Sequence, residues 1–256
     1  MVWVSVEAPI IPSLEKYGSE KARIFIDTCI THLIMHREGW IGKKMEELGI
    51  KSPREAVEFV INNIDYPSTL ETPDDKHVWE AFSGKIKYVV FKDYWSSASE
   101  VLMTYILNKK LYGKPGYGDF EDTSILATSM LRILNTPAYE VFGAIYSNNT
   151  LLGGHAWTIA KLEDGKWHLI ETFLTQPPKY PSNYPVINPE ENKWRIRNTI
   201  YEGWIKFNEK EYYEWREPGT QYSLEKYLAF EKKDKYNMRK YEALEKAWRI
   251  KTKVKI

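Results

Sequence analysis

Apolar residues recur at helical spacing along several stretches of the chain. Positions three and four residues apart lie on one face of a helix, so this pattern predicts amphipathic helices. We expect them over residues 19–37, 52–64, 97–108 and 120–134. A longer, charged helix over residues 224–248 carries a broken apolar stripe, which is typical of packing against a core or against a second copy.

Two of these helices carry start signals. Ser52 is followed by Pro53 and Glu55, the order of an N-cap, a first-turn proline and the glutamate of a capping box. Asp119 is a natural N-cap for the helix that begins at Phe120, and acidic residues follow where the helix dipole favours negative charge. Apolar residues at helical spacing behind this start predict a deeply packed helix.

Runs of β-branched and aromatic residues bounded by turn residues predict strands over residues 86–91, 139–146, 155–162 and 167–173. Further strands are expected between residues 194 and 207.

The turn Glu163-Asp164-Gly165 fixes the register of one hairpin. A three-residue loop usually places its glycine in the left-handed region, which makes Leu162 the partner of Lys166. Counting back from this pair puts His155 diagonal to Glu171 on one face, at a Cβ spacing of roughly 7 Å. A glutamate side chain can span that gap to an imidazole nitrogen.

Charge and composition narrow the function classes. Lys and Arg number 36 against 35 Asp and Glu, so a net charge of +1 gives no reason to expect nucleic acid as a partner. No run reaches the ~18 apolar residues of a membrane span, and the start of the chain does not read as a secretory signal. We therefore expect a cytoplasmic protein. Glutamine occurs only at 176 and 221, which suits a thermophilic source.

Three motifs occur in order along the chain: Gly118-Asp119-Phe120-Glu121-Asp122-Thr123, Gly154-His155-Ala156-Trp157, and Trp167-His168-Leu169-Ile170-Glu171-Thr172. Together they resemble the transglutaminase-like family, whose pattern is Gly-Asp-Cys-x-Asp, then His-Ala-Trp, then an acid after Trp. Archaeal members look most similar, since Asp93-Tyr94-Trp95 resembles a stretch that they carry upstream. The helix over 52–66 resembles the one that often precedes the family's core.

The resemblance implies an α+β, papain-like fold in which a central helix packs on an antiparallel sheet. It divides the chain into an N-terminal helical region (1–92), a transglutaminase-like core (93–175) and an addition (176–256). The addition comprises a proline-rich excursion at 176–189, further strands and the C-terminal helix. The three parts are expected to form one compact domain.

The family's chemistry implies a role for each motif residue. A thiol at a helix start is activated by the dipole, a histidine takes its proton, and a carboxylate orients the imidazole. The nucleophile position falls on Phe120, the base on His155 and the orienting acid on Glu171. Four further motif residues are expected in the helix cap, the core or the cleft wall: Trp95, Asp119, Asp122 and Trp157.

Phe120 has no nucleophilic atom, and removing a triad nucleophile costs on the order of 10⁶ in turnover. The sequence therefore predicts a catalytically inactive relative that binds a peptide or protein, without a cofactor. The first alternative is an active amidase, peptidase or transglutaminase in which Phe120 is an engineered or sequence-specific replacement of the cysteine. The second is a structural subunit that assembles, as a homo-oligomer for example, through its C-terminal helix.

Two other groups of side chains could supply a nucleophile or a metal site. Thr123 and Ser124 carry hydroxyls near the nucleophile position, but Ser124 lies about 5 Å further along the axis and should miss the histidine. Cys29, His32 and His36 have a Cys-x₂-His-x₃-His spacing that could ligate zinc from one helix. Packing is favoured, because Cys29 belongs to the predicted apolar stripe and no fourth ligand is evident.

Overall fold

Seven strands form one antiparallel sheet in the computed structural model, in the order β1-β13-β12-β8-β9-β10, with β11 also paired to β12. The structure describes residues 1–11, 28–35, 37–65, 75–79, 87–91, 95–172 and 184–217. The sheet strands are β1 (Val2–Ser5), β8 (Ala138–Ser147), β9 (Thr150–Lys161), β10 (Trp167–Ile170), β11 (Lys193–Ile196), β12 (Thr199–Phe207) and β13 (Tyr212–Arg216).

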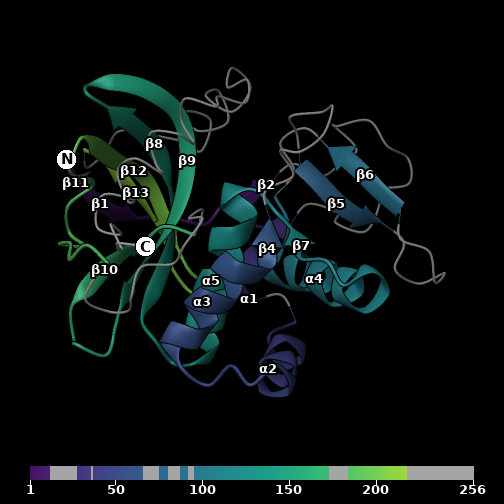
Figure 1. The fold of residues 1–256 in the computed structure, drawn as a ribbon. Helices are drawn as coiled ribbons and strands as arrows, with labels where there is room; N and C mark the ends of the chain where they lie inside the picture. The colour runs from purple at the N-terminus through teal and green to yellow at the C-terminus, as the bar shows by residue number, and fades with distance from the viewer. Residues whose placement is uncertain are drawn as a thin grey trace, which may run out of the picture.

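The helices of the described residues lie beside this sheet. They are α1 (His32–Met35), α2 (Glu38–Glu47), α3 (Pro53–Asn63), α4 (Ala98–Tyr112) and α5 (Phe120–Ile133). Helix α5 contacts β8 and β9, and all its residues from 120 to 131 are buried. Figure 1 shows α3 and α5 between the sheet and α4. The predicted α+β class, a central helix on an antiparallel sheet, is confirmed.

Three small strand pairs complete the described elements. They are β2 (Ile10–Ile11) with β3 (Thr28–Cys29), β4 (Ile64–Asp65) with β7 (Gly116–Tyr117), and β5 (Asp75–Trp79) with β6 (Lys87–Phe91). The β4–β7 pair is parallel and brings the end of α3 to the segment that leads into α5. The hairpin β5–β6 lies on the side away from the sheet (Figure 1).

The predicted helix starts are present. Ser52 accepts a hydrogen bond from the backbone N–H of Glu55 (3.3 Å), and Asp119 accepts one from that of Asp122 (3.2 Å). At the start of helix α4 the backbone N–H of Ser97 donates to the carboxylate of Glu100 (2.8 Å), one of the two bonds of a capping box. Side-chain oxygens thus satisfy N–H groups that have no partner within the helix.

The hairpin register is confirmed. The backbone N–H of Leu162 donates to the carbonyl of Lys166 (3.0 Å), and Gly165 has φ +75°. Residue 170 pairs with residue 158 at the end of β10, so the next step places Glu171 opposite Trp157. The turn between β8 and β9 also uses positive φ at both central asparagines, which matches the twist of a tight hairpin.

The predicted helix over 19–37 is wrong where the chain is described. Thr28–Cys29 is strand β3, a turn follows, and only the four residues of α1 are helical before Arg37 takes φ 58°. That left-handed residue breaks the helical path, and the unpredicted helix α2 begins after it. The half-buried Cys29 of a short strand and the buried residues of a turn and one helical turn have the same apolar spacing as a continuous helix.

The sheet takes strands from residues 2–5, 138–170 and 193–216. Strands β11 and β12 confirm the expectation for 194–207, whereas β1 and β13 were not foreseen. The described end of the proline-rich stretch packs beside β10, where the N–H of Leu169 donates to the carbonyl of Pro185 (3.0 Å). The predicted helix over 224–248 lies outside the described residues.

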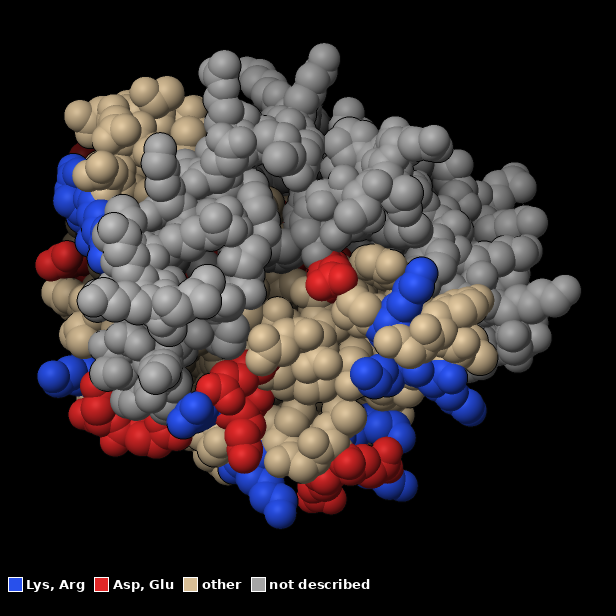
Figure 2. Space-filling view, viewed as in Figure 1, with Lys and Arg blue, Asp and Glu red and all other residues tan. Residues whose placement is uncertain are grey.

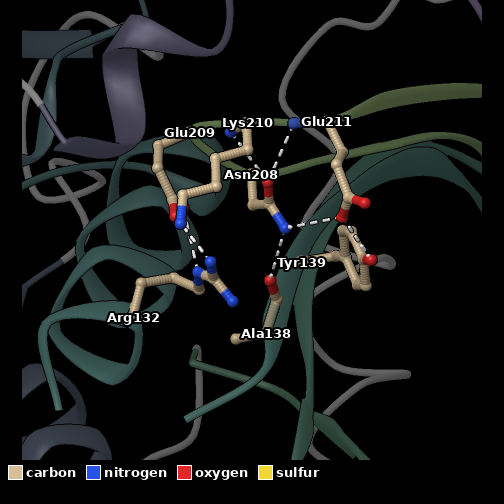
Figure 3. Close-up of polar contacts among 7 residues, drawn as sticks. All are labelled: Arg132, Ala138, Tyr139, Asn208, Glu209, Lys210 and Glu211. Carbon is tan, nitrogen blue, oxygen red and sulfur yellow. Dashed lines mark hydrogen bonds and ion pairs between the residues drawn. The ribbon is translucent and has the colours of Figure 1, made fainter. Parts of the chain in front are cut away.

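The turn between β12 and β13 is tied to the end of α5 and the start of β8 (Figure 3). Arg132 makes two hydrogen bonds to the carboxylate of Glu209, one of them from Nε at 2.9 Å. Asn208 Oδ1 accepts the backbone N–H of Glu211 (3.0 Å), whose carboxylate accepts the hydroxyl of Tyr139 (2.6 Å). The bidentate ion pair raises the pKa of Arg132. The Arg132–Glu209 pair thus joins helix α5 to the turn between β12 and β13, and the Tyr139–Glu211 bond joins that turn to β8.

Acidic and basic side chains are interspersed over the described part of the face in Figure 2, in keeping with the near-zero net charge. Within the described residues, no helix is long and apolar enough to cross a membrane.

A substitution at Gly143 on β8 would test how closely strands β8 and β12 pack. A Cβ there would overlap the carbonyl oxygen of Glu202, a backbone atom that cannot move without disturbing the sheet. We expect Gly143→Ala to lower the free energy of unfolding by about 1–3 kcal/mol, measured by urea denaturation. Gly39→Ala is the control, since nothing lies within 4 Å of its Cβ position on α2. Equal effects of the two variants would contradict the tight pairing.

Lys206 on β12 is buried beneath aromatic rings. Its Nζ donates to the carbonyl of Pro189 (2.9 Å) and lies 4.5 Å from the ring centroid of Trp3, 5.4 Å from that of Tyr139 and 5.3 Å from that of Tyr213. Burial lowers the pKa of Lys206 from 10.5 to about 8. The cation–π contacts with these rings therefore offset only part of the free-energy cost of burying the ammonium.

A folded-state pKa below the unfolded value means that the unfolded chain binds more protons between the two values. Lys206 should therefore make the free energy of unfolding rise from about pH 8 to about pH 10. We expect this rise, measured by urea denaturation, to be smaller in Lys206→Met than in the unmodified protein. Parallel profiles for the two proteins would show that the buried ammonium has an ordinary affinity for its proton.

Candidate functional site: a buried histidine–glutamate pair against Phe120

Phe120 is the first residue of α5, and its side chain packs against His155. The two ring centroids lie 4.4 Å apart at an interplanar angle of 76°, an edge-to-face contact. Phe120 is 7% exposed and His155 is fully buried. The structure thus places an apolar ring against the imidazole to which the family resemblance assigns the role of base.

His155 and Glu171 meet as the hairpin register predicts. His155 Nε2 lies 2.8 Å from Glu171 Oε2, and both side chains are fully buried. Because a carboxylate can only accept, the hydrogen in this bond belongs to Nε2. The other ring nitrogen, Nδ1, is then the one that could exchange a proton with a neighbouring group.

A second donor, from another strand of the sheet, reaches the same carboxylate. The hydroxyl of Tyr201, on β12, donates to Glu171 Oε2 at 3.0 Å. Sequence reasoning did not find this residue, since it lies 30 positions from the glutamate in a region recognised only as strand. No local motif marks it, and only the sheet order brings it to the site.

Aromatic side chains enclose the pair. The ring of Trp157 lies 5.1 Å from that of Tyr201 and 6.0 Å from that of His155. Trp95 is also buried, but its ring packs on Phe142, at 4.8 Å between centroids. Both tryptophans are therefore part of the core. This burial keeps water from the His155–Glu171 hydrogen bond and strengthens it.

The two aspartates of the first motif hold the start of α5. Asp119 caps the helix, whereas Asp122 Oδ1 accepts the backbone N–H of Ser96 at 2.7 Å. That bond fixes the segment before α4 against the first turn of α5. Both aspartates thus have structural partners.

The hydroxyls after Phe120 are engaged elsewhere. Ser124 Oγ lies 2.5 Å from Glu140 Oε1 and the same distance from the carbonyl oxygen of Phe120. Thr123 Oγ1 lies 2.8 Å from the hydroxyl of Thr172. The hydrogen-bond partners given for the two hydroxyls are side chains and carbonyl groups of the core, and His155 is not among them.

Glu140 is a fully buried carboxyl that sequence reasoning missed, because it lies within a strand of apolar residues. Burial raises its pKa well above the ordinary 4.5, the bond to Ser124 opposes this, and nearby acidic charge adds to the rise. Thr128 donates to its second oxygen (3.3 Å) and also contacts Thr158 (3.0 Å). A protonated Glu140 can donate to Ser124, whose own hydrogen then goes to the Phe120 carbonyl.

Cys29 and His32 do not lie on one helix, so the predicted zinc-ligand spacing on a single helical face is absent from the described residues. Cys29 lies in β3, with its Sγ 3.2 Å from the hydroxyl of Thr31, while the exposed His32 begins α1. His36 lies outside the described residues. No cluster of three His, Cys, Asp or Glu side chains suited to a metal ion occurs in the described part of the chain.

No protein-family model matches the chain, and no curated protein matches it. Solved structures show a distant likeness. The EGTA-treated form of Legionella pneumophila LapG has 16% identity and a TM-score of 0.36, covering 88% of this chain and 99% of that one. The calcium-bound form has 14% identity and a TM-score of 0.35, covering 86% and 93%.

A candidate cysteine protease from Cytophaga hutchinsonii has 15% identity and a TM-score of 0.31, covering 71% of this chain and 53% of that one. TM-scores under 0.5 indicate only a loose correspondence of elements. The chemistry of the site is therefore inferred from the residues of this chain alone.

Glu140→Gln tests the buried carboxyl. With a folded-state pKa above 4.5, the stability that protonated Glu140 contributes is present below pH 4.5 and is lost as the pH rises toward the folded-state value. We expect the free energy of unfolding to fall less steeply above pH 4.5 in Glu140→Gln than in the unmodified protein, measured by denaturant titration. The exposed Glu163→Gln is the control. A profile that Glu140→Gln leaves unchanged would rule out a proton held at Glu140.

Proposed function

We propose that this protein is a non-catalytic relative of the transglutaminase-like enzymes, and that its scaffold binds a peptide or protein. The contact between Phe120 and His155 carries the proposal, because the ring occupies the side of the imidazole where the family's motif has its thiol. A benzyl group supplies neither a nucleophile nor a proton. The order and spacing of the three motifs support the family resemblance.

The remaining site is suited to structure more than to turnover. His155 and Glu171 are fully buried, and Phe120 is nearly so, which leaves no exposed imidazole for a substrate carbonyl to approach. Acyl transfer requires nucleophile, base and substrate within hydrogen-bond reach of one another. The groups that remain form a closed unit, and a binding role would use surfaces outside it.

One observation favours the alternative, an enzyme of this class in which Phe120 replaces a cysteine. The His155–Glu171 bond keeps the length of a strong hydrogen bond, 2.8 Å, with Nε2 toward the acid. Nδ1 is then the nitrogen available to a group at position 120. The frame for a thiol would thus remain even though the thiol is absent.

Phe120→Cys in a Cys29→Ser background distinguishes a preserved frame from a decayed one. A thiol at this helix start beside His155 should have a pKa below the ordinary ~8.5, because the helix dipole and the imidazolium stabilise its anion. Thiolate absorbance against pH measures this directly, and alkylation near pH 6 should be about tenfold faster than at an exposed cysteine.

The matched controls are Lys210→Cys, at an exposed turn position, and Phe120→Cys combined with His155→Ala. The histidine variant should return the thiol to ordinary behaviour. A Phe120→Cys thiol that titrates like the one at 210 would show that the frame is not preserved. Separately, hydrolysis or transamidation of glutamine-containing peptides by the unmodified protein would contradict the proposal that it is not catalytic.

A further inference from the structure

Glu171 Oε2 receives two hydrogen bonds inside the core, one from His155 Nε2 (2.8 Å) and one from the Tyr201 hydroxyl (3.0 Å). All three side chains are fully buried. The carboxylate accepts both bonds, so the phenol must donate. Hydrogen bonds to a buried charge are stronger than neutral ones, and each restricts where the carboxylate can lie.

The sheet is built so that these side chains meet across β8. His155 on β9 pairs with Gly143, and Gly143 pairs in turn with Gly203 on β12. Neither glycine has a side chain, and Tyr201 lies two residues from the second one. The rings of Tyr201 and His155 therefore approach to 6.1 Å between centroids over the intervening strand.

We propose that Tyr201 is a positioning residue of this site: its hydroxyl orients Glu171, which holds His155 with the hydrogen on Nε2 and leaves Nδ1 as the ring nitrogen able to exchange a proton. The role rests on the proposed function in that it describes the same retained frame. The proposal adds Tyr201, a residue of β12 that lies outside all three sequence motifs, to the residues of the site. Tyr201 acts only through Glu171 and is not itself a reacting group.

Packing alone is the competing explanation, because the Tyr201 ring also contacts Trp157. Tyr201→Phe separates the two roles, since it keeps the ring and removes only the hydroxyl. Tyr212→Phe is a matched control on the neighbouring strand. Tyr212 is also buried, and its hydroxyl donates to a different carboxylate, that of Glu214, at 3.3 Å.

The first experiment uses nitrogen-15 NMR of the histidine rings in the otherwise unmodified protein. We expect a single tautomer at His155 with a slowly exchanging Nε2 hydrogen. In Tyr201→Phe that hydrogen should exchange about tenfold faster, and the second tautomer should appear, because one bond to the charged acceptor is lost. Tyr212→Phe should leave the His155 signals as they are. Identical His155 signals in Tyr201→Phe and the unmodified protein would overturn the proposal.

The second experiment places Tyr201→Phe in the Phe120→Cys, Cys29→Ser background. Thiol alkylation near pH 6 should slow about tenfold, whereas Tyr212→Phe should not slow it. An unreactive thiol in the parent variant would count against the preserved frame of the proposed function. The NMR comparison would still decide the role of Tyr201, because it needs no residue at 120 other than phenylalanine.

Discussion

The central helix is buried along every residue from 120 to 131, so the polar side chains that it carries into the core need partners there. Ser124 and Thr128 contact the carboxyl of Glu140 on the sheet, and Asp122 accepts a backbone N–H from Ser96 before α4. These bonds fix the helix against the strands on one side and against α4 on the other. The position of its first residue follows from them.

That first residue is Phe120, and its placement decides the character of the site. Its ring packs edge-to-face on the imidazole of His155, and both side chains are buried. Under the proposed function, this one side chain separates a sealed arrangement from a reactive one.

The buried His155–Glu171 pair contributes to the stability of the fold, whether or not it serves catalysis. Removing one partner of a buried hydrogen bond costs about 1–3 kcal/mol, because the other partner is left buried without its bond. Glu171 also accepts the hydroxyl of Tyr201, which adds to what a substitution would disturb. Phe120 adds buried apolar surface beside this pair. The presence of the pair is thus compatible with a purely structural role.

Local chemistry in the sequence determined the caps at Ser52 and Asp119 and, through the turn at Gly165, the register that joins His155 to Glu171. Each depends on residues a few positions apart or on counting along two paired strands. Only the tertiary structure decided the rest. Apolar spacing around Cys29 could not distinguish a strand and a turn from a helix, and the partners Tyr201 and Glu140 come from strands whose neighbours depend on sheet order. Sheet order is set by the packing of the whole core, which no single segment encodes.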